Sequence, residues 1–146
     1  MKRSDVETAT MWHIWFCVGA VAALVAVGAG ALGAHALKAR LDPASLAAYE
    51  TAVRYQMYHA FALLAAAWIM SLSRSRLATA AAVCFLAGMV MFSGSIYALT
   101  LVGWKWLGPV TPLGGATLMV GWLLLALAAI RSPAAPRDGT RPPANA

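Results

Sequence analysis

The stretch from residue 77 to residue 104, LATAAAVCFLAGMVMFSGSIYALTLVGW, contains no Asp, Glu, Lys or Arg. An α-helix needs about 20 predominantly apolar residues to cross the hydrocarbon core of a bilayer, so this stretch is long enough to span a membrane. Further stretches without charged residues run from residue 8 to 37, from 55 to 73 and from 106 to 130. The sequence therefore predicts four transmembrane helices.

The composition of the whole chain agrees with this prediction. Hydrophobic residues make up 62% of the 146 residues and charged residues 11%, whereas an average soluble domain has about 45–50% and about 25%. A soluble domain of this length could not cover its surface with so few polar residues. Unpaired backbone groups are not tolerated in lipid, and the alternating pattern of a membrane β-barrel is absent from the sequence. We therefore predict an all-α fold, a four-helix transmembrane bundle.

The cations mark the places where the predicted helices leave the membrane. Cytoplasmic loops carry an excess of Lys and Arg, so the side with more cations is expected to be cytoplasmic. One side holds Lys2, Arg3, Arg74, Arg76, Arg131, Arg137 and Arg141, and the other holds Lys38, Arg40, Arg54 and Lys105. Both termini are thus predicted to be cytoplasmic. The net charge of +6 is a topology signal, and no nucleic-acid partner is expected.

The chain divides into three predicted parts. We expect a cytoplasmic N-terminal segment over residues 1–10, a membrane domain over 11–131 and a disordered, proline-rich cytoplasmic tail over 132–146. In two places a capping residue precedes a proline at the first helical position, namely at Asp42-Pro43 and Thr111-Pro112. The membrane helices are expected at about 11–34, 43–72, 77–101 and 112–130.

Two motifs near the N-terminus have alternative interpretations. A cleaved signal peptide would explain the form of Ala34-His35-Ala36, but the apolar run before it is too long for one. The spacing G-x-G-x-x-G at residues 28–33 matches a dinucleotide fingerprint, yet no strand precedes it. We interpret the small residues instead as a packing face of the first helix, formed by Gly19, Ala22, Ala23, Ala26, Gly30 and Gly33.

When the polar residues are placed by depth, they gather in the extracytoplasmic half of the predicted bundle. Such a cluster is either a hydrogen-bonded network that fixes helix packing or a shallow binding site. Polar pairs inside a membrane contribute about 0.6–2 kcal/mol each, which is enough to specify packing, so we favour the network. The candidate polar cluster consists of His35, Glu50, Arg54, Tyr55, Tyr58, His59, Ser93, Ser95, Tyr97 and Thr111.

Two residue pairs carry more specific expectations. His59 should face the bundle interior, with Tyr97 or Ser93 as hydrogen-bond partners. Glu50 and Arg54 are four residues apart in the order that favours an ion pair, which we expect at the headgroup surface. No metal site is expected, because Cys17 and Cys84 lie in separate spans without the spacing of metal ligands.

Several blocks of sequence carry a resemblance to a known family. They are GAHAL at 33–37, ETAVRYQMYHA at 50–60, FSGSIYAL at 92–99 and LGPVTPLGG at 107–115. With four spans in this order, the chain resembles the bacterial domain-of-unknown-function family 423, which is related to the eukaryotic transmembrane protein 256. The resemblance covers about residues 18–130 and implies a small bacterial inner-membrane protein. It implies no activity, substrate or cofactor.

These observations favour a multi-pass inner-membrane protein that is not an enzyme and has no cofactor, and that acts as a binding, accessory or structural protein. Its expected partners are the lipid bilayer and either other membrane subunits or a second copy of the chain. A small transporter or channel component is the alternative, but no span contains a carboxylate or a lysine and no internal repeat is evident.

Two further classes have little support in the sequence. A haem bound by His35 and His59 would be without an attachment motif. An intramembrane enzyme would have Ser93 or Ser95 with His59 as its candidate groups, and no nucleophile motif surrounds those serines.

Overall fold

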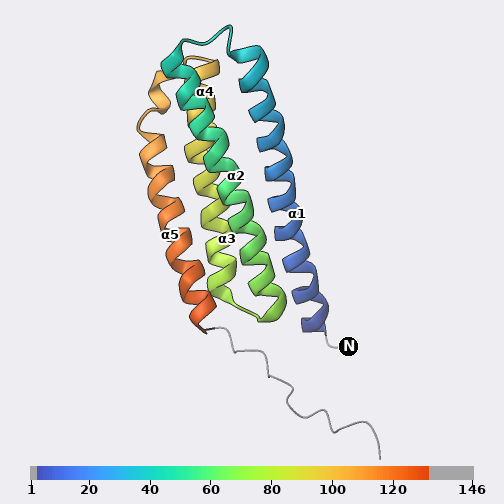
Figure 1. Ribbon diagram of the computed structural model, residues 1–146. Helices are drawn as coiled ribbons and strands as arrows, with labels where there is room; N and C mark the ends of the chain where they lie inside the picture. Colours follow the sequence, from blue (N-terminus) through green and yellow to red (C-terminus); the bar gives the residue numbers. More distant parts are fainter. Residues whose placement is uncertain (1–2, 132–146) are drawn as a thin grey trace, which may run out of the picture.

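The computed structural model describes residues 3–131, with side chains described from residue 11 onward. All regular secondary structure in this part of the chain is helical (Figure 1), which confirms the all-α class. The long helices are α1 (Arg3–Leu32), α2 (Pro43–Leu72), α3 (Arg76–Met89) and α5 (Val110–Arg131). Shorter elements are the π-helical turns η1 (Gly33–Leu37) and η2 (Val90–Gly94), the helix α4 (Ser95–Leu101) and the 3-10 turn η3 (Lys105–Leu107).

The long helices lie side by side with α2 in the middle (Figure 1). Helix α2 packs against α1 on one side and against α3 on another, and α5 packs against α3 and η2. Helix α4 continues the line of α3 beyond η2. The beginning of α1 and the end of α5 lie at the same end of the bundle.

Three helical stretches are long and apolar enough to cross a membrane: Met11–Leu37, Arg76–Leu101 and Lys105–Arg131. Helix α2 does not meet this standard, although it was predicted as a span. Its central position gives the physical reason, since the neighbouring helices bury polar side chains such as Gln56 and His59. A helix enclosed by others can therefore carry polar groups that a helix facing lipid could not.

The beginning of α2 follows its capping signal, whereas α5 begins at Val110, before the predicted cap at Thr111. The Asp42 carboxylate accepts hydrogen bonds from the backbone nitrogens of Ala44 at 3.0 Å and Ser45 at 3.1 Å, and Pro43 occupies the first helical position. The Ser45 side chain and these backbone groups hold the pKa of the Asp42 carboxyl below its ordinary value. Helix α2 has the predicted bounds, 43–72.

Other predicted boundaries need correction. The first helix begins at Arg3 instead of near Met11, so the N-terminal segment is not separate from it over the described residues. The helix predicted over 77–101 is divided by the wide turn η2, and the helix predicted from 112 begins at Val110. The tail predicted to be disordered, 132–146, lies outside the described residues.

Glycines mark the closest contacts between helices. A Cβ atom added at Gly19 would lie 2.9 Å from Leu64 Cδ2 and 3.1 Å from the carbonyl oxygen of Ala60, so α1 and α2 approach closely there. A Cβ atom at Gly114 would lie 2.5 Å from the backbone nitrogen of Phe92, so α5 is equally close to η2. The small-residue face predicted for the first helix does pack against α2, and close backbone approach maximises van der Waals contact in lipid.

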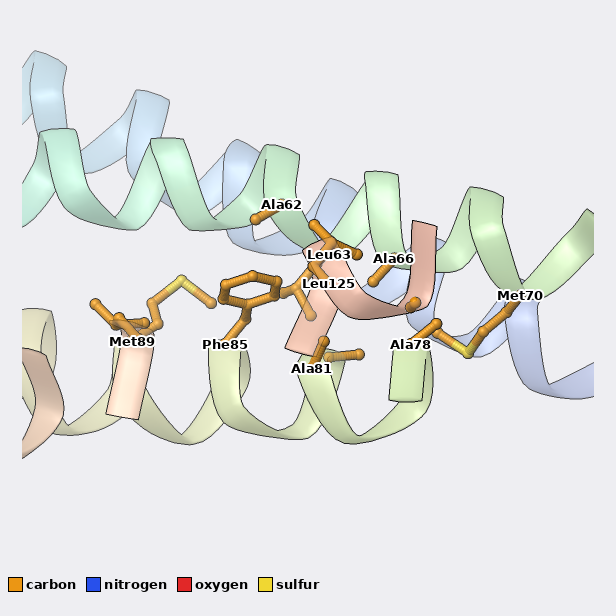
Figure 2. Packing of buried hydrophobic residues seen from close by; sticks show 12 residues of the cluster. Ala62, Leu63, Ala66, Met70, Ala78, Ala81, Phe85, Met89 and Leu125 are labelled. Atoms are coloured by element: carbon orange, nitrogen blue, oxygen red, sulfur yellow. The ribbon is translucent and has the colours of Figure 1, made fainter. Parts of the chain in front are cut away.

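The apolar core lies between α2, α3 and α5. Figure 2 shows the ring of Phe85 pointing from α3 towards α2, beside a row of small side chains. Phe85 is fully buried, as are Leu63, Ala66 and Ala81. Half of the buried residues in this cluster are alanines, which let α2 and α3 approach closely.

We expect Gly114→Ala to lower the free energy of unfolding by about 1–3 kcal/mol, because the added methyl group meets the η2 backbone, which cannot rotate away as a side chain can. Gly28→Ala is the matched control, since nothing lies within 4 Å of its added Cβ. Melting temperatures in a mild detergent, followed by circular dichroism, measure both. Equal melting temperatures for the two variants would contradict the close approach of α5 to η2.

Candidate functional site

The interior of the bundle contains a few buried polar side chains, those of Gln56, His59, Ser93 and Ser95. A polar group in an apolar environment costs free energy unless it is hydrogen-bonded. Within the described part of the chain, every buried side-chain nitrogen or oxygen has a hydrogen-bond partner. Each buried polar side chain therefore finds its partner inside the protein, and we call this set of hydrogen bonds the interior network.

Gln56 connects three helices. Its Nε2 donates a hydrogen bond to the carbonyl oxygen of Ala22 in α1 at 3.0 Å, and its Oε1 accepts one from the Tyr97 hydroxyl in α4 at 2.9 Å. About two turns earlier, the Tyr49 hydroxyl donates to the carbonyl oxygen of Ala29 at 3.0 Å. The rings of Tyr49 and Tyr97 have their centroids 5.1 Å apart. These contacts fix α1 and α4 to α2.

The environment of His59 determines its protonation state. Nδ1 lies 2.7 Å from the carbonyl oxygen of Tyr55, and Nε2 lies 3.2 Å from the indole nitrogen of Trp122. A carbonyl oxygen only accepts and an indole N–H only donates, so Nδ1 carries the proton and Nε2 is the acceptor. The ring is then neutral, and both nitrogens are engaged. In this arrangement neither nitrogen is free to bind haem iron or to act as a base towards a serine.

The two serines connect η2 and α4 to their neighbours. Ser93 donates to the carbonyl oxygen of Ala52 in α2 at 2.8 Å. The Ser95 hydroxyl donates to the carbonyl oxygen of Phe92 at 3.0 Å and lies 2.7 Å from the Thr111 hydroxyl of α5. Since its single hydrogen is used for Phe92, Ser95 accepts from Thr111. The partners predicted for His59, Tyr97 and Ser93, are thus wrong, because each is bonded elsewhere.

The predicted polar cluster separates into two groups. His59, Ser93, Ser95, Tyr97 and Thr111 belong to the interior network. His35, Glu50, Arg54, Tyr55 and Tyr58 have exposed side chains.

The predicted ion pair between Glu50 and Arg54 is absent from the described residues. Arg54 instead donates to the Thr51 hydroxyl at 3.3 Å. Thr51 lies three residues before Arg54 on the neighbouring turn of α2, so its hydroxyl is within reach of the guanidinium group.

Sequence reasoning missed three residues of the network: Tyr49, Gln56 and Trp122. Gln56 lies inside the block ETAVRYQMYHA, and an amide in a membrane span has to find hydrogen-bond partners, a signal that could have identified it. Trp122 lies far from the helix ends, where interfacial tryptophans are common. A tryptophan at that depth suggests an internal partner for its N–H group.

An open groove of about 540 Å³ lies between α2 and α5. Tyr55 stacks against Phe92 with ring centroids 4.6 Å apart, and the Phe85 and Trp122 rings meet edge to face at 5.2 Å. Within the described chain, the Tyr58 hydroxyl has no hydrogen-bond partner, and its residue is 55% exposed. We call this the aromatic groove; its lining residues are Tyr55, Tyr58, His59, Phe61, Gly115, Leu118, Met119 and Trp122.

A second, smaller open hollow of about 240 Å³ lies along the contact between α1 and α2. It is lined by the small residues Gly30 of α1 and Gly33 and Ala34 of η1. Helix α2 contributes Tyr49, Glu50, Val53 and Arg54. We call it the α1–α2 hollow. Of the exposed predicted residues, Tyr55 and Tyr58 therefore line the aromatic groove and Glu50 and Arg54 line the α1–α2 hollow. His35 lines neither.

Comparison with known proteins places this arrangement in a family. A family model described as "Protein of unknown function (DUF423)" matches residues 29–115. The UPF0382 membrane protein YwdK of Bacillus subtilis is 39% identical over 119 residues, which cover 81% of this chain and 97% of YwdK.

Staphylococcal proteins give the same result. A UPF0382 membrane protein of Staphylococcus aureus is 39% identical over 118 residues, or 81% of this chain and 96% of the relative. One of Staphylococcus saprophyticus is 40% identical over 114 residues, or 78% of this chain and 94% of the relative. No solved structure matches the chain significantly.

Two tyrosines allow the same chemical change to be compared inside and outside the network. Tyr97→Phe leaves the Gln56 Oε1 atom without its donor, so we expect the free energy of unfolding to fall by about 1–3 kcal/mol. Tyr58→Phe removes a hydroxyl that has no partner, and it should leave stability within about 0.5 kcal/mol of the wild type. Thermal unfolding in detergent measures both. A loss in Tyr58→Phe as large as that in Tyr97→Phe would argue against the network.

Proposed function

The chain belongs to the DUF423 family of membrane proteins, and on this premise we propose that it is a small, non-enzymatic binding or accessory protein of the bacterial inner membrane. In this proposal, four helices span the membrane, both termini are cytoplasmic and no cofactor is bound. The interior network holds the helices together. The aromatic groove binds the apolar part of a lipid-soluble molecule from the surrounding bilayer.

The proposed topology has two supports. The beginning of α1 and the end of α5 lie at the same end of the bundle, as an even number of spans requires. The loop between α2 and α3 lies at that end as well and carries Arg74 and Arg76, so the cation-rich loop and the termini would share the cytoplasmic side. Helix α2 would be the fourth span, with its polar side chains directed into the bundle.

One observation supports the proposed function: within the described chain, every buried polar side-chain atom already has a hydrogen-bond partner inside the protein. Catalytic sites and proton pathways need polar groups that remain free for a substrate or a proton. Here the inward-facing Gln56 and His59 are both occupied. Their arrangement favours a structural role for the interior and leaves the outer surface as the place for binding.

The aromatic groove has the properties of a ligand site. Pockets for small molecules are concave, mainly apolar and rich in aromatic side chains, with a few polar groups that orient the ligand. The groove is open on the side of the bundle, so a ligand would enter from the bilayer. The free hydroxyl of Tyr58 provides a hydrogen-bond donor at its edge.

Reporter fusions test the topology. We expect a periplasmic reporter to be active when fused after Leu41 and inactive when fused after Ser73, because the first loop would be extracytoplasmic and the second cytoplasmic. A cytoplasmic reporter should give the complementary pattern. Activity of the periplasmic reporter after Ser73 together with its silence after Leu41 would invert the orientation.

Filling the groove tests the binding role. The Cβ atom of a residue at position 115 would make ordinary contacts of 3.7 and 3.8 Å with the Phe92 ring, so Gly115→Leu should fold and fill the groove. Ala116→Leu adds similar bulk at an exposed position that does not line the groove. Native mass spectrometry from mild detergent should detect a bound apolar molecule in the wild type and in Ala116→Leu, and much less of it in Gly115→Leu.

Two results would contradict this assignment. Equal occupancy in all three proteins would place the bound molecule elsewhere, and an empty wild-type protein would remove the binding role. Thermal unfolding of Gly115→Leu checks that its helices remain packed.

A further inference from the structure

The α1–α2 hollow contains two opposite charges that do not pair with each other. Glu50 and Arg54 lie on successive turns of α2 and both line the hollow. Arg54 has one hydrogen bond, to Thr51 at 3.3 Å, and the Glu50 carboxylate has no partner within the described chain. Both side chains are exposed. The hollow therefore offers one acceptor group and one donor group to an external molecule.

The depth of these charges follows from helix geometry. From Arg54 to Leu72 helix α2 rises by about 27 Å, at about 1.5 Å per residue. This length is close to the hydrocarbon thickness of a bilayer, which is about 30 Å. If Leu72 lies at one edge of the hydrocarbon core, Arg54 lies near the opposite edge and Glu50 one turn further out. The two charges are then at the level of the lipid headgroups.

The hollow exists because α1 has glycines at this level. A Cβ atom at Gly33 would lie 3.0 Å from the Tyr49 ring, and one at Gly30 would lie 3.5 Å from Val53 Cγ1. Larger residues at these positions would occupy the space between the helices. The walls below the charges are thus small and apolar, as the glycerol and upper acyl carbons of a lipid would require.

We propose that the α1–α2 hollow binds the headgroup of a phospholipid that carries a primary ammonium group. The Glu50 carboxylate accepts hydrogen bonds from the ammonium group, and the Arg54 guanidinium donates to the phosphate. The two residues are four positions apart, which is about 6 Å along the helix axis, and a two-carbon linker separates phosphate from ammonium in phosphoethanolamine by a comparable distance. This inference depends on the proposal that α2 spans the membrane, and it is independent of the aromatic groove.

The charge pattern selects among lipid classes. An arginine alone would attract any phosphate, including that of an anionic lipid. The neighbouring Glu50 repels a lipid with net negative charge, and it gains no hydrogen bond from the quaternary ammonium of choline, which has no N–H group. The preferred ligand is therefore a zwitterionic lipid whose ammonium group can donate hydrogen bonds.

The test is lipid competition on the full-length protein. The protein is reconstituted into nanodiscs with equal amounts of phosphatidylethanolamine, phosphatidylcholine and phosphatidylglycerol. It is then released from the nanodiscs in the mass spectrometer, and the lipids that stay bound to it are counted by native mass spectrometry. We expect phosphatidylethanolamine to be enriched over phosphatidylcholine by up to about fivefold, the range for an exposed ion pair. Glu50→Gln should abolish this enrichment, and Arg54→Gln should reduce the retention of all three lipids.

Matched controls separate the hollow from general charge effects. Arg40→Gln removes a cation in the α1–α2 loop that does not line the hollow, and it should keep the wild-type preference. Gly30→Leu, whose added Cβ makes an ordinary 3.5 Å contact with Val53 Cγ1, narrows the hollow without changing charge and should lower retention. Gly115→Leu alters only the aromatic groove, so its lipid preference should equal that of the wild type.

The outcomes are decisive in either direction. No preference among the three lipids, or a preference that Glu50→Gln leaves unchanged, would overturn the inference. Enrichment of phosphatidylglycerol in the wild type would overturn it too, because Glu50 would then have no selective effect. The reporter fusions after Leu41 and Ser73 measure the membrane placement of α2 separately, so a failed topology can be distinguished from a failed headgroup site.

Discussion

An apolar interior offers no hydrogen bonds, so every polar group buried in it has to find its partner within the protein. In this chain the requirement is met mainly through α2. Gln56 bonds to α1 and α4, His59 to α5, and the backbone of Ala52 to Ser93 of η2. Each bond joins α2 to a different neighbour, so the helices are held at a defined rotation as well as at a defined distance. The arrangement of the remaining helices depends on these contacts.

Close packing supplies the other part of the attraction. Hydrophobic burial does not distinguish a helix neighbour from a lipid tail, so helices in membranes associate through van der Waals contact. Gly19 brings α1 against α2, and Gly114 brings α5 against η2. The alanines of the core have the same effect between α2 and α3. Short distances between backbones also bring the buried polar side chains within hydrogen-bond reach of carbonyl groups on the neighbouring helix.

Features that depend on local composition could be predicted from the sequence. Features that depend on how each helix is rotated about its own axis could not. Charge-free stretches and the Asp42-Pro43 cap located the helices, and small residues indicated the packing face of the first helix. The partner of His59 could not be predicted, because it depends on how α2 and α5 are turned relative to each other. The π-helical turn η2 also has no sequence pattern that the periodicity of hydrophobic residues would reveal. Gln56 was overlooked although its amide was a usable signal.

The turn η2 has a consequence for how this helical segment can change. A π-helical turn closes its hydrogen bonds over one more residue than an α-helical turn, and one residue corresponds to a rotation of about 100° in an α-helix. If residues 90–94 became regular α-helix with the chain length unchanged, α4 would turn by about 100° around its axis. Ser95 would then turn away from Thr111, and Tyr97 away from Gln56. The π-helical turn thus fixes the rotation of α4, so that Ser95 faces α5 and Tyr97 faces α2.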